Sequence, residues 1–339
     1  MTTTERGAVH EALVERARTL DKGAVARLVS LFEDRRPAAV HERVRVLELL
    51  DRPAGDEGSA DRACAVLGIT GTPGSGKSSL VGALTQRMLE HREDLSIAVL
   101  AVDPSSHVSG GALLGDRTRM RFTPDERRLF FRSQASGTDL GGLGPSSFQV
   151  CRLLSRLFDC VIIETVGIGQ SEADIRHLAD RVYLVLQPLG GDEVQFLKAG
   201  IIEVPHVFVL NKSDEPSSET SYHQLRSSMW LARPFDEDAP PIYRTSTVTG
   251  DGLDGLEADM LAAVDRASPG ALASREPYFL ARWVEDEWGR VGTRFLEGEL
   301  GGAAAFVEAC GGYDRAQLEL DRRLRAQLAR DGDEGSAGG

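Results

Sequence analysis

The segment Leu67–Leu80, with the sequence LGITGTPGSGKSSL, restricts the possible fold of this chain more than any other. An apolar run leads into a glycine-rich turn and a helix start, and the turn fits the pattern G-x-x-x-x-G-K-[ST]. Glycines allow backbone angles that point successive N–H groups into one concavity, and the following helix adds the positive end of its dipole. We therefore expect a phosphate-binding loop, rather than an ordinary strand-turn-helix joint, that contacts a nucleotide through Gly71, Gly74, Ser75, Gly76, Lys77, Ser78 and Ser79.

Two side chains of this loop have chemical roles in the prediction. Lys77 is expected to reach the β- and γ-phosphates as a catalytic cation, and the Ser78 hydroxyl to ligate Mg²⁺. By itself such a loop indicates a nucleoside triphosphate. The base and the reaction have to come from other segments.

Composition limits the class of protein. At 339 residues, with 41% apolar and 27% charged residues, the chain is typical of a globular protein. Its formal charge of −13 argues against a nucleic-acid partner, because phosphate backbones require a basic face. The four cysteines form no C-x-x-C pair, no apolar run approaches the length of a membrane span, and the N-terminus has no apolar signal core. These features predict a cytoplasmic protein without a membrane partner.

The middle of the chain, residues 61–270, alternates short apolar runs with helical segments, which is typical of an α/β domain with a mostly parallel sheet flanked by helices. We expect strands near 64–70, 96–103, 128–133, 160–166, 181–188, 205–211 and 241–246. We expect helices near 77–91, 146–157, 171–179, 193–202, 217–231 and 253–266. Ligands bind beyond the carboxyl ends of such strands, where the candidate motifs lie.

Helical extensions are expected on both sides of this domain. Residues 1–60 form an N-terminal arm and linker, with two helices separated at Arg36-Pro37. Residues 271–330 form a C-terminal arm of two helices, about 276–298 and 302–330, and 331–339 a disordered tail. The first C-terminal helix has an aromatic-rich face, which fits either packing within the chain or a dimer interface: Leu280, Trp283, Val284, Trp288, Val291 and Phe295.

Guanine specificity is predicted by Asn211-Lys212-Ser213-Asp214, which fits N-K-x-D after an apolar run. The Asp214 carboxylate can accept hydrogen bonds from the ring N–H and the exocyclic amine of guanine, whereas adenine has an acceptor at that ring position. Asn211 can bond the other base edge, and the stem of Lys212 can lie along the phosphate loop. In the turn after the next strand, Ser246 and Thr247 offer N–H groups to the guanine carbonyl, or simply cap the following turn.

The metal end of the site is expected near Glu164, which precedes Gly167 where many GTPases have D-x-x-G. With one more methylene than aspartate, Glu164 could contact the metal directly, bind it through water, or activate the attacking water. The Gly167 N–H is expected at the γ-phosphate. Gln170 is a candidate for positioning the water, and the alternative is a polar residue at a helix start.

Two further carboxylates are candidates for the metal. Asp103 ends a strand, and Asp116 lies in the long polar segment 104–127. Because Mg²⁺ takes few protein ligands, we expect Asp116 to be the nucleotide-dependent ligand and Asp103 to hold a metal-bound water. One of the three arginines that follow Asp116 could neutralise developing charge.

Three stretches together resemble the MeaB/ArgK GTPases, which belong with the metallochaperone-like (SIMIBI-type) P-loop GTPases: 98–106 (AVLAVDPSS), 110–120 (GGALLGDRTRM) and 164–172 (ETVGIGQSE). The resemblance covers about residues 64–265. It implies a homodimeric, GTP-hydrolysing chaperone that gates cofactor loading and protection of an adenosylcobalamin-dependent acyl-CoA mutase, such as methylmalonyl-CoA mutase. It also implies a further switch in the loop 190–198, with Asp192, Glu193 and Lys198 as signalling residues.

The resemblance implies GTP and GDP as ligands and Mg²⁺ as cofactor. Slow intrinsic hydrolysis is expected, because neither an arginine finger nor a water-positioning residue is certain from the sequence. Two other functions fit the phosphate loop. A P-loop ATPase or small-molecule kinase, as in the older transport-linked description of ArgK, predicts a preference for ATP. A nucleotide-gated binding module predicts tight GTP binding with little turnover.

Overall fold

The computed structural model describes residues 3–52, 63–103, 125–135, 143–165, 171–188, 205–232 and 239–336. Contacts divide the chain into two compact units, and each is treated by itself. The sheet unit comprises residues 62–143 and 154–269, and the helical unit comprises residues 1–61, 144–153 and 270–339. The chain therefore leaves the sheet unit after residue 143, returns to it at residue 154, and leaves it again after residue 269.

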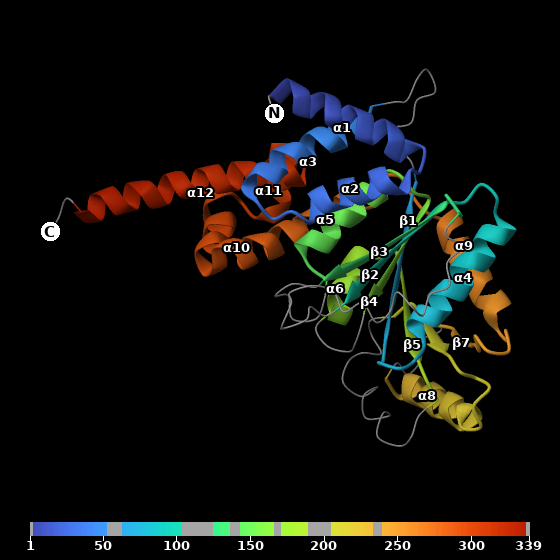
Figure 1. Cartoon of the computed structure of the whole chain (residues 1–339). Helices are drawn as coiled ribbons and strands as arrows, with labels where there is room; N and C mark the ends of the chain where they lie inside the picture. Colours follow the sequence, from blue (N-terminus) through green and yellow to red (C-terminus); the bar gives the residue numbers. More distant parts are fainter. Residues whose placement is uncertain are drawn as a thin grey trace. The chain divides into compact units, whose positions relative to one another are not determined.

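The sheet unit is built on parallel strands, as the sequence predicts. Among the described residues, seven strands pair in the order β3-β2-β4-β1-β5-β6-β7. Each pair is parallel, as expected when helical connections return the chain to the same edge (Figure 1). The strands are β1 (Ala65–Gly71), β2 (Ile97–Asp103), β3 (Leu129–Ala135), β4 (Cys160–Thr165), β5 (Arg181–Leu186), β6 (Val207–Leu210) and β7 (Ile242–Arg244).

One face of the sheet is covered by α4 (Lys77–His91) and α9 (Leu253–Asp265), which lie together beside it (Figure 1). Side chains alternate along each strand, so that every second residue of β1 and β5 points toward these helices. The core on this face is formed by buried residues that include Leu67, Ile69, Leu80, Leu84, Met88, Tyr183, Val185, Leu256 and Met260.

The opposite face is covered by α6 (Ser171–Leu178) and α8 (Ser218–Ala232). Gly68 of β1 lets α6 come close, because a Cβ added there would lie 2.7 Å from Cγ1 of Ile175. The alternate residues of β5 and β6 pack against α8, in a cluster of Leu184, Leu186, Phe208, Leu210, Leu225 and Met229. The helix expected near 193–202 lies outside the described residues.

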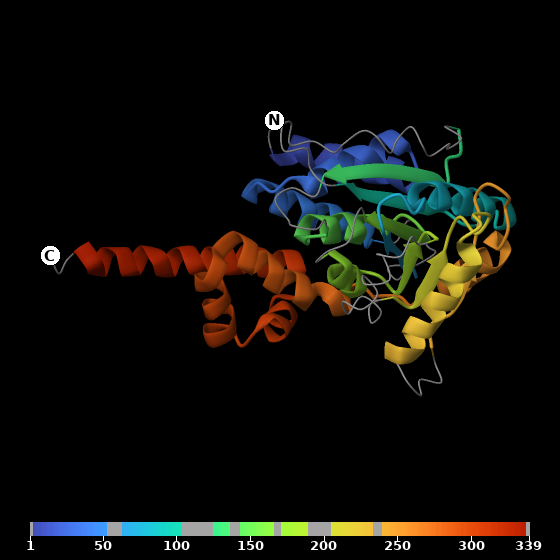
Figure 2. The ribbon, with the colours of Figure 1, turned by 90° about the horizontal axis from the view of Figure 1, so that it is seen from below.

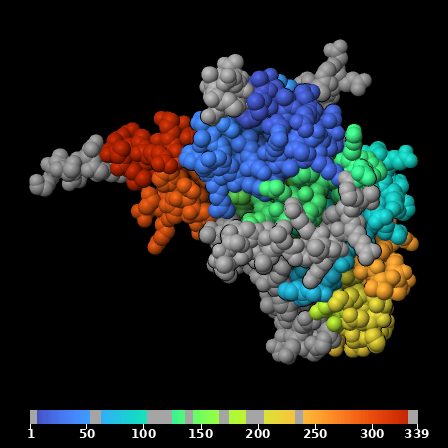
Figure 3. Space-filling view, in the orientation of Figure 1, coloured from blue at the N-terminus to red at the C-terminus, as the bar shows by residue number. Residues whose placement is uncertain are grey.

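The helical unit combines segments from both ends of the chain with residues 144–153. Its helices are α1 (Thr3–Arg18), α2 (Lys22–Glu33), α3 (Pro37–Leu50), most of α5 (Pro145–Leu154), the 3₁₀ turn η4 (Ala273–Arg275), α10 (Glu276–Glu299), α11 (Ala303–Cys310) and α12 (Tyr313–Ser336). α12 runs beside α10 and contacts α3 (Figures 1 and 2). In the space-filling view, the surface of the N-terminal segment meets that of the C-terminal helices, in agreement with the contact between α3 and α12 (Figure 3).

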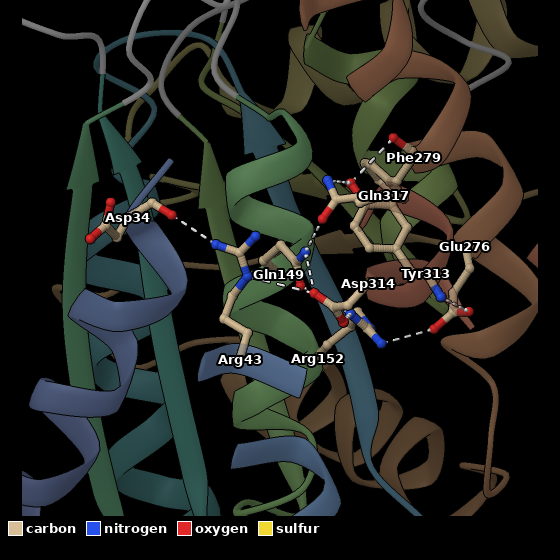
Figure 4. Close-up of polar contacts among 9 residues, drawn as sticks. All are labelled: Asp34, Arg43, Gln149, Arg152, Glu276, Phe279, Tyr313, Asp314 and Gln317. Carbon is tan, nitrogen blue, oxygen red and sulfur yellow. Dashed lines mark hydrogen bonds and ion pairs between the residues drawn. The ribbon is translucent and has the colours of Figure 1, made fainter. Parts of the chain in front are cut away.

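A buried cluster of aromatic and charged side chains lies between helices of this unit, and Figure 4 shows its polar contacts. The rings of Phe148 and Phe279 stack with their centroids 4.3 Å apart, and Tyr313 lies edge-on to Phe148 at 5.2 Å. Beside the rings, Arg152 pairs with Asp314, and its Nη2 lies 3.1 Å from Oε1 of Glu276. Arg43 of α3 also reaches the cluster, with its Nε 3.5 Å from Oδ1 of Asp314. Four helices, α3, α5, α10 and α12, are therefore joined by residues that are distant in sequence.

The N-terminal arm differs from the prediction of two helices. The structure has three, because the chain also breaks between α1 and α2, where Leu20 has a φ of +59°. Asp21 then caps α2: its Oδ1 accepts a hydrogen bond of 2.9 Å from Ala24 N. The predicted break at Arg36-Pro37 is present, with Pro37 as the first residue of α3.

The C-terminal arm also differs from the prediction. The expected helix 302–330 is wrong as a single element, because Gly311 and Gly312, with φ of +71° and +124°, separate α11 from α12. α12 continues to Ser336, into the segment expected to be disordered. The single aromatic face of 276–298 is wrong too: Gly289 is non-helical within α10, and Val291 beyond it is 55% exposed.

The sheet-unit helices end close to their expected positions, but the helix predicted over 146–157 ends at Leu154. Among the helices that the structure describes, none is both long enough and apolar enough to cross a membrane.

Candidate functional site

The turn between β1 and α4 has the backbone conformation that its glycines predict. Gly71, Gly74 and Gly76 have φ of +141°, +80° and +85°, which L-residues rarely adopt. At Gly71 the constraint is also spatial, because an added Cβ would lie 1.9 Å from the carbonyl oxygen of Val185 in β5. The phosphate loop therefore packs directly on the neighbouring strand, and glycine is required where it begins.

Lys77 begins α4, and its ammonium folds back over this turn. Its Nζ donates hydrogen bonds of 2.9 Å to Gly71 O and 3.0 Å to Thr72 O, and the residue is 6% exposed. A buried lysine held by carbonyls at the rim of the turn can exchange these partners for phosphate oxygens. Ser79, one position beyond Ser78, is exposed.

The structure brings together two of the predicted metal ligands. The parallel register pairs Ile69 of β1 with Glu164 of β4, so that Glu164 lies beside the start of the phosphate loop. There its Oε1 accepts a hydrogen bond of 2.6 Å from the Ser78 hydroxyl, and Glu164 is 2% exposed. A hydroxyl and a buried carboxylate at one point form an all-oxygen donor set, which fits Mg²⁺.

Asp103 ends β2 at the same edge of the sheet. Ala101 of β2 pairs with Glu164, which places the Asp103 backbone two residues further toward the carboxyl end. Several predicted site residues lie outside the described residues: Asp116, Gly167, Gln170, Asp192, Glu193 and Lys198. Among the described residues, no group of three or more histidine, cysteine, aspartate or glutamate side chains could hold a metal ion.

The N-K-x-D segment follows β6 and reaches the phosphate loop through Asn211. Asn211 Nδ2 donates a 2.8 Å hydrogen bond to Ser75 O, and its Oδ1 accepts one of 3.2 Å from the Thr245 hydroxyl. The amide is buried, with Asn211 1% exposed. Both ends of the Asn211 amide therefore bind protein groups, whereas the sequence analysis expects this amide to bind an edge of the guanine base. Asn211 therefore connects the phosphate loop, the N-K-x-D segment and the turn after β7.

Asp214 is exposed at the mouth of the site, and Ser246 orients its carboxylate. The Ser246 hydroxyl donates a 2.5 Å hydrogen bond to Asp214 Oδ1 and accepts bonds of 3.2 Å from the N–H groups of Val248 and Thr249. One carboxylate oxygen is thereby fixed, which presents the group in a defined orientation. Thr247 lies next in the same turn, half-buried.

The phosphate loop and the N-K-x-D segment thus meet at one edge of the sheet. A family model matches residues 25–277 of this chain. That model is described as the methylmalonyl Co-A mutase-associated GTPase MeaB. The chain belongs to the MeaB family. It is accordingly a P-loop GTPase, as the resemblance in the sequence implies.

Several proteins are similar to this chain over about two thirds or more of their own length. A Caulobacter vibrioides protein, also named as a GTPase, is 39% identical over 271 residues, which are 78% of this chain and 80% of that protein. GTPase ArgK of Escherichia coli is 35% identical over 248 residues, 72% of each chain. The mitochondrial methylmalonic aciduria type A homolog of Caenorhabditis briggsae is 30% identical over 272 residues, 78% of this chain and 66% of that protein.

A solved structure supports the fold of this MeaB-family chain. The crystal structure of an LAO/AO transport system kinase superposes with a TM-score of 0.58 and 22% identity. The match covers 95% of this chain and 98% of that one. At this identity the likeness concerns the architecture alone.

Two contacts in the site were not predicted from the sequence. The Thr245 hydroxyl binds Asn211, and Gln187, after β5, binds Lys212. Both residues follow directly after a strand of the parallel sheet, which is a signal available in the sequence. Their partners become evident only when β5, β6 and β7 are placed side by side.

Proposed function

We propose that this protein is a Mg²⁺-dependent GTPase that gates cofactor loading and protection of an adenosylcobalamin-dependent acyl-CoA mutase of the methylmalonyl-CoA mutase type. The observation that carries the nucleotide assignment is the hydrogen bond from Asn211 Nδ2 to Ser75 O, which joins the base segment to the phosphate loop. Support for the mutase as partner comes from the family description and from the Caenorhabditis briggsae relative named after methylmalonic aciduria.

In this proposal the N–H groups of the turn Gly71–Ser78, with Ser79 beside it, bind the phosphates, and Lys77 moves from its carbonyl partners onto the β- and γ-phosphates. Asp214 reads the guanine ring, with Ser246 holding its carboxylate and Thr247 beside the base. Lys212 lies along the base and the phosphate loop. The site then selects GTP and GDP over adenine nucleotides.

Mg²⁺ would be held by Ser78, with Glu164 close by and Asp103 and Asp116 as further carboxylates. The ion would supply positive charge that stabilises the phosphate oxygens during hydrolysis. Gly167 contacts the γ-phosphate, and Glu164 or Gln170 orients the attacking water. We expect hydrolysis by the protein alone to be slow, because P-loop GTPases commonly need a partner to complete this arrangement.

In this proposal the mutase accelerates turnover through contacts with the segments 104–127 and 189–198, with Asp192, Glu193 and Lys198 transmitting the nucleotide state. We propose that the protein acts as a cytoplasmic homodimer through its terminal helices. Hydrolysis resets the cycle after the cofactor has been transferred.

GTP turnover by the full-length chain, alone and with methylmalonyl-CoA mutase, tests this function. We expect turnover to rise several-fold with the mutase and ATP to compete poorly. The control is Lys77→Ala, which removes the phosphate cation and should weaken GTP binding about 100-fold or more. Turnover indifferent to the mutase would refute the chaperone role, and unchanged GTP affinity of Lys77→Ala would refute the site assignment.

A further inference from the structure

Gln187 lies between the two halves of the nucleotide site, although it belongs to neither sequence motif. It follows β5 directly, and its Oε1 accepts a hydrogen bond of 3.1 Å from Lys212 Nζ. The same amide lies against the phosphate loop: a Cβ added at Gly74 would be 3.7 Å from Gln187 Oε1 and 4.0 Å from its Nε2. One side chain therefore contacts the lysine of N-K-x-D and borders the central glycine of the phosphate loop.

The backbone conformation of Lys212 is fixed by hydrogen bonds of its neighbours. Its φ is +58°, a left-handed conformation that is unfavourable for a residue with a side chain. The conformation is held on both sides, because Asn211 N donates to Leu186 O at 2.8 Å and Ser213 N donates to Thr245 O at 2.9 Å. The start of the Lys212 side chain is thus well defined, while its far end depends on what the ammonium contacts.

The ammonium has two contacts of unequal quality. Gln187 Oε1 is within hydrogen-bond distance, whereas Oε1 of Glu215 is 3.9 Å away, and the side chains of Lys212 and Glu215 are 38% and 44% exposed. Exposed ion pairs at such a distance contribute little, because water screens them. Gln187 is therefore the residue that restricts the lysine, whose free side chain otherwise samples many rotamers.

We propose that Gln187 is a positioning residue for guanine-nucleotide binding. Its amide oxygen holds the Lys212 ammonium, so that the aliphatic stem of Lys212 is already extended where the base and ribose bind. Binding then loses less side-chain entropy, which tightens the complex without any contact between Gln187 and the reacting phosphate. This inference rests on the guanine-nucleotide site of the proposed function and is independent of the mutase.

The proposal predicts a particular kinetic pattern. Lys212 contacts the part of the nucleotide that GTP and GDP share, so both should lose affinity equally. A uniform loss raises KM and leaves kcat unchanged, because ground state and transition state are affected alike. A residue that acted on the γ-phosphate or on the attacking water would lower kcat instead.

Gln187→Met is the sharpest variant, because methionine keeps the length and volume beside Gly74 and removes the acceptor. We expect its Kd for GDP and for GTP to rise about fivefold, the size of one net hydrogen bond, as measured by titration with fluorescent nucleotides. The matched control is Gln86→Met on α4, whose amide donates a 2.9 Å hydrogen bond to the exposed Glu90 and lies on the helix surface. It should bind both nucleotides like the wild type.

A double-mutant cycle separates positioning through Lys212 from a general structural effect. Lys212→Met keeps the apolar stem and removes the ammonium, so adding Gln187→Met to it should weaken binding no further. Additive losses, or a Gln187→Met protein with wild-type affinity, overturn the inference. Thermal unfolding of each variant verifies that it is folded. If the wild type itself fails to bind GDP, the proposed function fails and this inference with it; wild-type binding unaffected by Gln187→Met refutes this inference alone.

Discussion

At the scale of single residues, the candidate site consists of side chains that have defined partners within the protein. In the proposed site Asp214 selects the base, because a carboxylate can accept two hydrogen bonds where guanine presents two donors. Its Oδ1 is already held by the Ser246 hydroxyl at 2.5 Å. The exposed carboxylate thus has an orientation that the motif N-K-x-D does not specify by itself.

Asp214→Asn should change base preference rather than the fold. The asparagine carbonyl can still accept from the ring N–H, but its NH₂ group faces the exocyclic amine of guanine and leaves that amine without an acceptor, so we expect GDP affinity to fall about 10- to 100-fold. Xanthine has a carbonyl where guanine has its exocyclic amine, so affinity for xanthosine diphosphate should rise. Competition titrations measure both. The control Asp251→Asn, an exposed residue whose carboxylate accepts from the Thr249 hydroxyl at 2.7 Å, should retain the wild-type preference.

At the scale of elements, the glycine pair between α11 and α12 determines where one helix ends and the next begins. Gly311 caps α11 in the left-handed conformation, with φ of +71° and its N–H directed to the carbonyls of Glu308 and Val307. Helical spacing alone predicts one continuous helix across this position, because apolar residues continue on both sides. The left-handed cap overrides that periodicity, since glycine takes this conformation without the steric cost of a side chain.

Gly311→Ala should therefore destabilise the protein. Open space surrounds the new Cβ, whose nearest neighbour is Nη1 of Arg315 at 3.6 Å, so the cost is conformational and about 1–2 kcal/mol. Gly298→Ala in α10 is the matched control, because its Cβ meets nothing within 4 Å and its backbone is ordinary helix. It should be neutral or stabilise by about 0.4–1 kcal/mol. Urea unfolding of both variants measures the difference, and equal stabilities would contradict the cap.

At the scale of the whole molecule, the ionic cluster of the helical unit joins residues more than 250 positions apart. Arg43 Nη1 donates 2.7 Å to Asp34 O, and its Nε lies 3.5 Å from Asp314 Oδ1; Asp314 also pairs with Arg152 (Figure 4). Burial opposes ionisation of Asp314, but the charge and hydrogen bonds of Arg152 outweigh it and lower the pKa of this carboxyl below its usual value. The pairing therefore stabilises the folded unit while Asp314 is ionised.

The sign of the pH dependence follows from that lowered pKa. The ion pairs of Asp314 stabilise the folded protein fully above the usual aspartate pKa. This contribution is lost as the pH falls through the lowered pKa that Asp314 has in the folded state. We expect the melting temperature, followed by tryptophan fluorescence, to which Trp283 and Trp288 of this unit contribute, to fall as the pH drops below about 4. Asp314→Asn should cost about 3 kcal/mol at neutral pH and flatten this dependence. The control is Asp265→Asn. The Asp265 side chain is 60% exposed in its ion pair with Arg92, so this variant should change neither the stability at neutral pH nor its pH dependence.

The sequence alone predicts most of what local chemistry controls. The pattern from Gly71 to Ser78 requires a glycine turn before a helix, and alternating apolar runs require a parallel sheet, because buried strands need apolar residues on both faces. The N-K-x-D pattern similarly predicts guanine recognition by Asp214, whereas the structure gives Asn211 protein partners at both ends of its side chain. These conclusions depend on residues within a few positions of one another, where covalent geometry and periodicity restrict the outcome.

Tertiary structure decided what distant segments do together. The order of the strands in the sheet brings three pairs of residues into hydrogen-bond contact. These are Ser78 with Glu164, Asn211 with the carbonyl of Ser75, and Lys212 with Gln187. The aromatic stripe after residue 276 was expected to be continuous, and the backbone at Gly289 breaks it. Hydrogen bonds and packing between two segments depend on the distance between them in space. The number of residues between two segments along the chain does not determine that distance. The phosphate loop can therefore be predicted from the sequence, while the residues proposed to position its ligand are identified only from the tertiary structure.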